Sequence, residues 1–370
     1  MTLVAHVTTV HPRDDIRIFH KECMSLARAG YDVVQVVGDG LGAAQVAGVR
    51  IIDIGARPAG RLVRMRRQTA AALAAIRREQ PALVHLHDPE LLPVAAKLAR
   101  EGLMVIYDAH EDVPRQVLTK QWIPAWLRPV ISRTFEIYEN YQVRQVAAVA
   151  AATPHIMRRF ARVTQRSVNV SNYPAVDELA PLARPSPRER AVCYVGGLMR
   201  TRGLQQMVRA VARVEGLRFL VCGSFEDQEF EAQVRAEPGW RHVEYLGQVG
   251  RDVVRDVMSR SSAGLVTLLP LPSYIDSLPI KMFEYMSAEL PVVASAFPSW
   301  REIVERHGCG LCVDPLDVDA IAAALRQIVD DPQLAASMGR AGRVAVHAKY
   351  NWPQAEHNLL ALYRELLGAP

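Results

Sequence analysis

The chain has 370 residues, of which half are hydrophobic and 22% are charged, and its formal net charge is +5 at neutral pH. This length allows two domains of ordinary size, and this composition excludes a disordered or fibrous protein. No apolar run approaches the roughly 20 residues that a membrane-spanning helix needs. The start lacks the features of a signal peptide, and the five cysteines are scattered, so we expect a cytoplasmic protein.

The first half of the chain alternates short apolar strands with amphipathic helical stretches. Continuous apolar strands separated by helices indicate a parallel sheet that is covered on both faces. The strands are predicted at residues 3–9, 32–38, 83–87, 104–110, 146–153 and 167–173.

Residues 56–80 concentrate positive charge. Two interpretations stay open: a solvated helix face opposite Leu73 and Ile76, or a surface for an anionic acceptor or for peripheral association with an anionic membrane. Nucleic acid is disfavoured as a partner, because the stretch has no interleaved aromatic residues and no reader motif. The arginines are Arg57, Arg61, Arg64, Arg66, Arg67, Arg77 and Arg78.

Four prolines and no periodicity follow in residues 174–190, which predicts a linker. The alternation then restarts, so the chain is predicted to build two Rossmann-like, doubly wound α/β domains whose ligands bind beyond the carboxyl ends of the strands. The second set of strands is predicted at residues 191–197, 217–223, 242–247, 263–269, 291–296 and 310–314, before a last helix at about 351–368.

The stretch "YVGGLMRTRG" (194–203) runs from a strand through two glycines into a helix. Gly196 and Gly197 allow a ligand to approach the backbone, and a helix start offers free N–H groups. Arg200 and Arg202 suit phosphate, although the P-loop pattern is absent. The alternative is a tight turn with solvated arginines.

A second stretch, "DSLPIKMFEYMSAELPVVAS" (276–295), predicts a helix that begins near Ser277 and Pro279. The helix is apolar nearly all round, yet Lys281 and Glu284 share a stripe with Ser277. A buried charge needs a partner, and we expect a ligand to supply it: a pyrophosphate near Lys281 and a vicinal diol at Glu284. Asp276 would hold a further hydroxyl. The alternative is an internal Lys281–Glu284 pair.

Histidines and acids follow two neighbouring strands. His85, His87 and Asp88 come at the end of one, and His110 follows the next. A His-x-His pair with an acid is a plausible metal site, but no fourth ligand is evident. The favoured interpretation is a polar wall without metal, from which His110 reaches into an active site.

At this point the motifs resemble a known family, the retaining, nucleotide-sugar-dependent glycosyltransferases of family four (group 1). The resemblance is carried by two acids eight positions apart, Asp276 and Glu284, before "MSAELPVVAS", by "GGLMRTRG", by "VSNYP" before the linker and by the closing "KYNWPQAEHNLLALYREL". It implies the GT-B fold: two Rossmann-like domains facing a central cleft, with the C-terminal helix crossing back to the N-terminal domain.

The resemblance also implies how the domains divide the work. Residues 1–174 with 353–370 would bind the acceptor, 175–190 would be the linker, and 191–352 would bind the donor. The donor would be a nucleotide-sugar, UDP-linked in preference to GDP- or dTDP-linked, and no metal would be required.

Individual roles follow from the matching positions. Glu284 would bind the ribose, Asp276 the sugar hydroxyls and Arg202 the diphosphate, while His110 would lie beside the donor sugar and the acceptor. Gly197 replaces an arginine of the family, a loss that Arg200 or Lys281 would restore. The stretch 8–22 replaces a Gly-Gly loop, and a wall for the acceptor is expected there from His11, Arg13 and Arg17.

Three other functions stay open: a sugar-nucleotide epimerase of the same fold, a metal-dependent hydrolase using His85, His87 and His110, and a non-catalytic sugar-nucleotide binding protein. The preferred reaction is sugar transfer to an acceptor hydroxyl with retention of configuration, in polysaccharide, glycolipid or glycosylated-metabolite biosynthesis.

Overall fold

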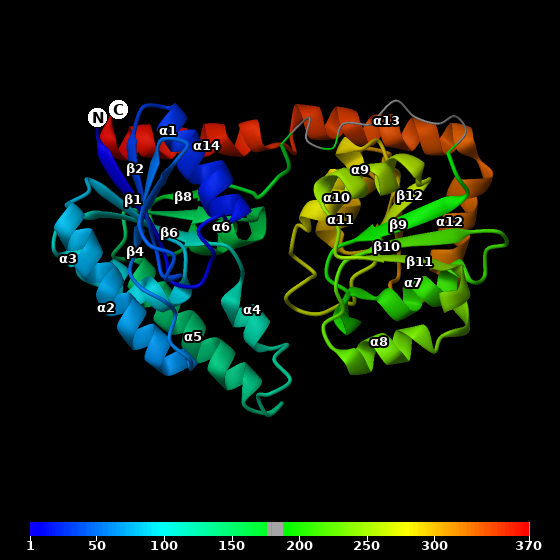
Figure 1. The fold of residues 1–370 in the computed structure, drawn as a ribbon, viewed down its shortest axis with the longest axis horizontal. Coiled ribbons are helices and arrows are strands. Elements are labelled where there is room, and N and C mark those ends of the chain that lie inside the picture. Colours follow the sequence, from blue (N-terminus) through cyan, green and yellow to red (C-terminus); the bar gives the residue numbers. More distant parts are fainter. Residues whose placement is uncertain (176–178, 180–187, 370) are drawn as a thin grey trace. The chain divides into compact units, whose positions relative to one another are not determined.

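A computed structural model describes residues 1–175, 179 and 188–369. The chain divides into two compact units, unit 1 (Met1–Asn172 with Trp352–Pro370) and unit 2 (Tyr173–Asn351). Each unit is a parallel sheet with helices packed on it (Figure 1). The predicted linker at 175–190 lies largely outside the described residues.

The sheet of unit 1 has eight strands in the order β3-β4-β2-β1-β5-β6-β7-β8. All of its pairings are parallel except that of β3 with β4. The sequence missed β3 and β4, because this short stretch mixes glycine and polar residues with its apolar ones. The strands are β1 (Leu3–Thr8), β2 (Asp32–Val37), β3 (Ala44–Val46), β4 (Val49–Asp53), β5 (Leu83–Leu86), β6 (Met104–Ala109), β7 (Ala148–Ala151) and β8 (Ser167–Asn169).

The last helix of the chain, α14 (Trp352–Leu367), belongs to unit 1, as the fold expectation required. Its Trp352 indole donates to the Ser25 hydroxyl at 3.1 Å, and Tyr363 is fully buried. The other helices of unit 1 are η1 (Ile16–Cys23), α1 (Met24–Arg28), α2 (Arg61–Glu79), η2 (Pro89–Leu91), α3 (Leu92–Arg100), α4 (Val113–Val117), α5 (Arg128–Val143) and α6 (Pro154–Phe160).

The helix η1 is a π-helix, a form that the amphipathic spacing of this half of the chain did not predict. Asp15 caps its start by accepting from the amides of Arg17 and Ile18, both at 2.9 Å. Because a π-helix bonds residues five apart, Arg17 and Glu22 lie one above the other and both turn inward. The Arg17 Nε lies 3.1 Å from the Glu22 Oε1.

The sheet of unit 2 has six parallel strands in the order β11-β10-β9-β12-β13-β14. All six were predicted. They are β9 (Ala191–Val195), β10 (Arg218–Cys222), β11 (Val243–Gly247), β12 (Ala263–Val266), β13 (Val292–Ser295) and β14 (Gly310–Val313). The helices are η3 (Arg200–Arg202), α7 (Leu204–Val211), α8 (Gln228–Arg235), η4 (Pro238–His242), α9 (Arg251–Arg260), α10 (Ile280–Ser287), α11 (Pro298–Val304), α12 (Val318–Asp330) and α13 (Pro332–Ala348).

Each sheet has one topological switch point, the position where the order of its strands reverses. In unit 1 the first strand, β1, lies between β2 and β5, and in unit 2 the first strand, β9, lies between β10 and β12. Ligands of open parallel sheets bind beyond the carboxyl ends of strands at such points. The functional residues are therefore expected directly after β1 and β5 and directly after β9.

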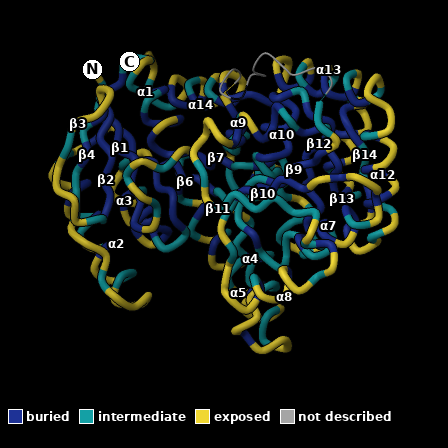
Figure 2. The backbone as a smooth tube through the Cα atoms, turned by 45° about the vertical axis from the view of Figure 1, so that its right-hand side comes forward, coloured by how far each residue is buried: buried dark blue, intermediate teal, exposed yellow. Residues whose placement is uncertain are grey.

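The strands form the buried centre of each unit, and exposure rises toward the outer helices (Figure 2). None of the described helices is both long enough and apolar enough to cross a membrane. All five cysteines are free thiols, and burial raises the pKa of Cys309 and of Cys312 to about 12.

Candidate functional site

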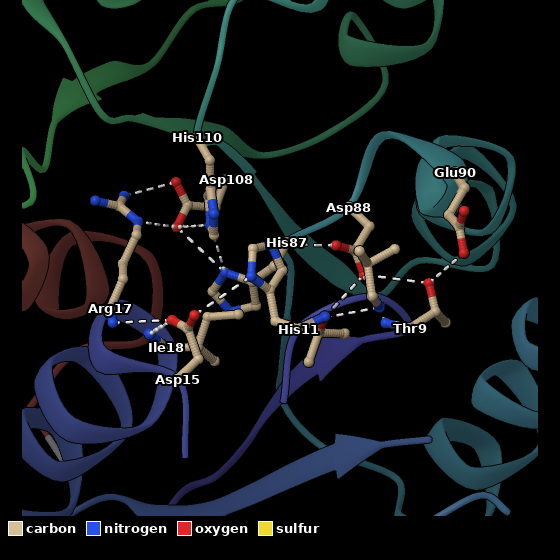
Figure 3. A network of polar contacts seen from close by, with 12 residues as sticks. Thr9, His11, Asp15, Arg17, Ile18, His87, Asp88, Glu90, Asp108 and His110 are labelled. Carbon is tan, nitrogen blue, oxygen red and sulfur yellow. Dashed lines mark hydrogen bonds and ion pairs between the residues drawn. The ribbon is translucent and has the colours of Figure 1, made fainter. Parts of the chain in front are cut away.

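Asp88, the first residue to turn away after β5, joins the two loops at the switch point of unit 1 (Figure 3). Its Oδ2 accepts from the amide of Thr9 at 2.5 Å, from the amide of Val10 at 3.2 Å and from the hydroxyl of Thr8 at 2.9 Å. The side chain is only 1% exposed. The carboxylate therefore fixes the end of β1 against the end of β5.

Asp108, near the end of β6, is the second buried carboxylate of unit 1. Its two oxygens accept from the Arg17 guanidinium, at 3.1 Å from Nε and 2.7 Å from Nη2. Burial alone would raise the pKa of Asp108, but Arg17 and the imidazole of His110 hold it well below its usual range. Arg17, expected in an acceptor wall on a polar loop, is 4% exposed and is instead the counter-ion of Asp108.

His110 is held by the same carboxylate. Its Nε2 lies 3.1 Å from the Asp108 Oδ2, and the His87 Nδ1 lies 3.2 Å from that oxygen. Burial lowers the pKa of His87 to about 4, so that imidazole is neutral at physiological pH. His87 is fully buried, whereas the His110 side chain is 16% exposed. Asp108 therefore orients His110 while leaving part of its ring accessible.

A hydrogen-bonded cluster of buried side chains lies behind His87. The Tyr363 hydroxyl is 3.0 Å from the His6 Nε2 and 3.0 Å from the His85 Nδ1, and the His6 Nδ1 is 2.9 Å from the His87 Nε2. Burial raises the pKa of Glu22, which lies beside this cluster. The helix from the end of the chain thus completes the support of His110.

Two groups of described residues gather possible metal ligands. The atoms within each group lie within 4.8 Å of one another, and imidazoles with carboxylates are the ligands that zinc prefers. In this cluster, however, the Arg17 guanidinium contacts both carboxylates, Glu22 and Asp108, and supplies positive charge there. The groups are His6, Glu22, His85 and His87, and His87, Asp108 and His110.

Two other residues expected on the acceptor side, His11 and Arg13, lie at the surface of unit 1. The His11 ring lies 3.3 Å from Asp15 and 3.6 Å from Asp88, and the hydrogen bond with Asp15 raises the pKa of His11. Arg13 donates two hydrogen bonds of 2.6 Å to Asp39. A hollow of about 590 Å³ lies beside it, lined by Pro12, Arg13, Asp14, Asp39, Leu41, Ala56 and Arg57.

The switch point of unit 2 is built from glycines. Gly196 follows β9 with a φ of +130°, and a Cβ there would lie 2.8 Å from the Lys281 Nζ. Gly223 follows β10 with a φ of +142°, and a Cβ there would lie 2.0 Å from the Gly196 carbonyl oxygen. Only glycine fits both positions. The loop after β9 thereby brings its backbone close to Lys281, and the loop after β10 packs closely on Gly196.

Lys281 is the second residue of α10 and is 7% exposed. Its Nζ lies 3.8 Å above the ring of Tyr194 and has no hydrogen-bond partner among the described residues. Burial and the neighbouring Arg202 lower the pKa of Lys281 well below its usual value, and Glu284 opposes this shift. Arg202 donates to the Gly197 carbonyl at 3.4 Å. Four predicted donor residues therefore lie together: Gly196, Gly197, Arg202 and Lys281.

Arg200 turns to a different partner. Its Nη1 donates to Glu226 at 3.0 Å and to Asp227 at 2.8 Å, both in the segment between β10 and α8. These carboxylates raise the pKa of Arg200. The guanidinium that was expected to help bind phosphate is therefore already paired within unit 2.

The start of α10 differs from the prediction. The helix begins at Ile280 with Pro279 as its N-cap, so Ser277 lies outside it and does not extend the stripe of Lys281 and Glu284. The Ser277 hydroxyl donates to the Tyr274 carbonyl at 2.9 Å. Asp276 is exposed on the same turn.

Glu284 has a partner within the chain, which corrects the expectation that only a ligand would complete it. Its Oε1 accepts from the Arg251 Nη1 at 2.9 Å. The Glu284 side chain is 9% exposed and that of Arg251 is 45% exposed. Arg251 opens α9, and its only signal in the sequence was a basic residue directly after "LGQVG".

Two family models match the chain, one in each half. The model described as "Glycosyl transferase 4-like domain" matches residues 17–172, and the model described as "Glycosyl transferases group 1" matches residues 182–345. Together they cover most of the sequence.

Curated relatives include an MMP alpha-(1->4)-mannosyltransferase of Mycolicibacterium hassiacum, 23% identical over 301 residues, which are 76% of this chain and 70% of that protein. A phosphatidyl-myo-inositol mannosyltransferase of Mycolicibacterium smegmatis is 26% identical over 301 residues, 78% of this chain and 72% of the relative.

Solved structures share the fold. Sucrose-phosphate synthase from Thermosynechococcus elongatus superposes with a TM-score of 0.81 at 21% identity and 100% coverage of both chains. Anabaena HepE in complex with UDP has a TM-score of 0.72 at 13% identity, with 99% of this chain and 100% of that chain covered. The same values hold for WaaG, a glycosyltransferase involved in lipopolysaccharide biosynthesis. The chain belongs to the group 1 glycosyltransferases, and its two parallel-sheet units have the GT-B fold that the sequence predicted.

Proposed function

We propose that this glycosyltransferase moves a sugar from a nucleotide-sugar to an acceptor hydroxyl with retention of configuration. The observation that carries the proposal is the buried amine of Lys281, which has no hydrogen-bond partner among the residues described. A buried cation is costly unless an anion completes it. A diphosphate is such an anion. The loops at Gly196 and Gly223 have no side chains at these positions, so a diphosphate could approach and bind their backbone.

The donor side is assigned to residues 191–352. Lys281 and Arg202 would neutralise the diphosphate beside Gly196 and Gly197. Glu284 would bind the ribose, because a carboxylate has about four acceptor positions and the bond from Arg251 occupies one. Asp276 would bind sugar hydroxyls. UDP is the favoured nucleotide, supported by HepE, which was solved in complex with UDP, and GDP or dTDP is the alternative.

The acceptor side is assigned to residues 1–174 with 353–370. His110, oriented by Asp108, would lie beside the acceptor hydroxyl and the donor sugar. The acceptor would attack from the face from which the nucleoside diphosphate departs, so the chain contributes positioning and charge stabilisation, without a metal. His11 and Arg13 remain candidates for contacts with the acceptor, whereas Arg17 acts through Asp108.

The setting proposed is the assembly of a polysaccharide, a glycolipid or a glycosylated metabolite, at the cytoplasmic face of a membrane. A lipid-linked acceptor is supported by one of the relatives, the phosphatidyl-myo-inositol mannosyltransferase. Residues 56–80 would contribute to membrane association, since Arg61, Arg66 and Arg67 are exposed on α2. Family membership favours transfer over an epimerase or a metal-dependent hydrolase.

Titration calorimetry with UDP, GDP and dTDP tests the donor side. We expect micromolar binding of one nucleotide by the wild-type protein and a loss of about 10- to 100-fold in affinity for Lys281→Met, the range for a hydrogen bond to a charged group. Lys349→Met is the matched control, because Lys349 is an exposed lysine of the same unit. Absence of binding for all three nucleotides, or unchanged affinity in Lys281→Met, would contradict the assignment.

A further inference from the structure

Arg251 of unit 2 contacts a residue of the proposed donor site, although it has no role in that assignment itself. It is the first residue of α9, and its Nη1 donates to the Glu284 Oε1 at 2.9 Å. The loop before Arg251 follows β11, so this residue lies near the carboxyl ends of the strands, where open parallel sheets bind their ligands. Helices α9 and α10 lie side by side in both views (Figures 1 and 2), and the bond joins the start of α9 to α10.

The bond between Arg251 and Glu284 contributes little to the stability of unit 2. The Arg251 side chain is 45% exposed, and an ion pair with a solvated partner is weak because water screens it. The Glu284 side chain is only 9% exposed, so this weak pair offsets only part of the cost of burying its carboxylate. A guanidinium has five N–H donors, so Arg251 has the capacity to bond Glu284 and a ligand at the same time.

Arg251 stands at one end of a row of four charged side chains. Burial and the neighbouring Arg202 lower the pKa of Lys281, and Glu284 opposes this shift. Arg251 in turn donates to Glu284. At the other end of the row, a Cβ on Gly196 would lie 2.8 Å from the Lys281 Nζ and 3.6 Å from the Arg202 Nη1. A diphosphate bound beside these two cations leaves its nucleoside to extend toward Glu284 and Arg251.

The spacing of this row fits a nucleoside diphosphate. Lys281 and Glu284 both lie on α10, and the three-residue step between them is a rise of about 4.5 Å along the helix. In a nucleoside diphosphate the phosphates are attached at C5′, the 3′-hydroxyl comes next along the sugar ring, and the 2′-hydroxyl lies farther away, beside the base. With the diphosphate at Lys281, the vicinal diol falls at Glu284 and its 2′-hydroxyl falls toward Arg251.

On the basis of the proposed function, we propose that Arg251 and Glu284 together bind the 2′-hydroxyl of the donor's ribose and thereby select ribonucleotide donors over deoxyribonucleotide donors. A hydroxyl is both a donor and an acceptor. The 2′-hydroxyl donates to the Glu284 carboxylate and accepts from the Arg251 guanidinium, so it completes both members of the pair. A 2′-deoxyribose makes neither bond, and a site built to bond a hydroxyl rejects the analogue that lacks it.

The pair of Arg251 and Glu284 narrows the class of donor. UDP-sugars and GDP-sugars carry the 2′-hydroxyl, whereas dTDP-sugars lack it. The donor is therefore a sugar linked to a ribonucleoside diphosphate, and dTDP is removed from the alternatives. The choice between uracil and guanine is made by other contacts, because both nucleotides present the same ribose to this pair.

Titration calorimetry with UDP and 2′-deoxy-UDP tests the pair, because these two ligands differ only in the 2′-hydroxyl. We expect the wild-type protein to bind UDP about 10- to 100-fold more tightly than 2′-deoxy-UDP. Arg251→Met should weaken the binding of UDP by about tenfold. The same variant should leave the binding of 2′-deoxy-UDP nearly unchanged, because that ligand lacks the group with which Arg251 is coupled. For 3′-deoxy-UDP, which keeps the 2′-hydroxyl, Arg251→Met should cause the same loss as for UDP.

Arg255→Met is the matched control on the protein side. Arg255 lies one turn further along α9 and pairs with Asp252 at 3.4 Å, so its loss should leave the affinities for all three ligands unchanged. Wild-type protein that binds UDP and 2′-deoxy-UDP equally overturns the inference. So does an Arg251→Met variant that weakens both ligands by the same factor, or one whose effect disappears with 3′-deoxy-UDP. Absence of any UDP binding contradicts the proposed function itself, and the inference with it, so the two failures are distinguishable.

Discussion

The two units place buried cations at their switch points in opposite ways. In unit 1 the buried Arg17 is paired with two carboxylates and a backbone carbonyl, at distances of 2.6–3.1 Å. In unit 2 the buried Lys281 has a tyrosine ring and no hydrogen bond within the described residues. The first cation is paired within its own unit, and the second has no hydrogen-bond partner among the described residues.

The difference separates a unit whose buried cation is already paired from a unit whose buried cation is, under the proposed function, left for a ligand. Unit 1 uses its charges on one another, and the result is a fixed orientation for His87 and His110. Unit 2 keeps a positive charge in a low-dielectric position, where an anion would interact strongly with it. The three predictions below test this contrast.

Removing Arg17, the cation that is paired within unit 1, should cause the largest change in stability. Arg17→Met leaves Asp108 and Glu22 buried without their counter-ion, so we expect the free energy of unfolding of unit 1 to fall by about 3–5 kcal/mol. Chemical denaturation followed by circular dichroism measures this loss. The affinity for UDP should be unchanged, since unit 2 retains its residues.

Arg77→Met is the control for Arg17→Met. Arg77 pairs with Glu101 at the surface of the same unit, with side chains 50% and 41% exposed. Such pairs contribute about 0–1 kcal/mol. If the two arginine variants lose the same stability, the network around Asp108 is not the stabilising feature described here.

Removing Lys281, the buried cation of unit 2, should change the free energy of unfolding in the opposite direction. In the absence of nucleotide, Lys281→Met replaces a buried ammonium by an apolar side chain of similar length, so we expect the unfolding free energy of unit 2 to rise by about 1–3 kcal/mol. Thermal unfolding with and without UDP measures both parts of the effect. A destabilised variant would show that Lys281 is already satisfied within the chain.

The smallest effect is a dependence on pH. Because the pKa of Lys281 is lowered in the folded state, the unfolded chain holds this proton at pH values where the folded protein has released it. Stability of unit 2 should therefore rise with pH between the lowered pKa and the unfolded value of about 10.4, while UDP affinity falls. Wild type and Lys281→Met are compared across that range, and parallel curves would contradict the assignment.

Periodicity and turn chemistry were enough to predict most of the fold. Continuous buried strands such as Val292–Ser295 and glycine turns such as Gly196–Gly197 can be recognised from their own short stretch of sequence. The strands Ala44–Val46 and Val49–Asp53 were missed, because short strands near the edge of a sheet are mixed in polarity. The π-helix was also missed, because no local pattern distinguishes its wider turn from that of an ordinary helix.

The sequence predicted which site residues lie together only where those residues are in loops next to the ends of neighbouring strands. Gly196, Gly197, Arg202 and Lys281 meet because the loops after β9 and before α10 converge. The bond from Arg251 to Glu284 joins residues 33 positions apart, and the pairing of Arg17 with Asp108 joins residues 91 positions apart. No local pattern encodes such pairs, and they decided the roles of Arg17 and Glu284.

The helix α14 has a consequence for biosynthesis. Unit 2 is contiguous in sequence, whereas the first 172 residues need a segment that begins at Trp352 to finish their core. Since Tyr363 supplies the hydroxyl that joins His6 to His85, the cluster behind His110 cannot be assembled until the segment from Trp352 to Tyr363 has left the ribosome. Unit 1 is therefore completed last, after unit 2 has had time to fold.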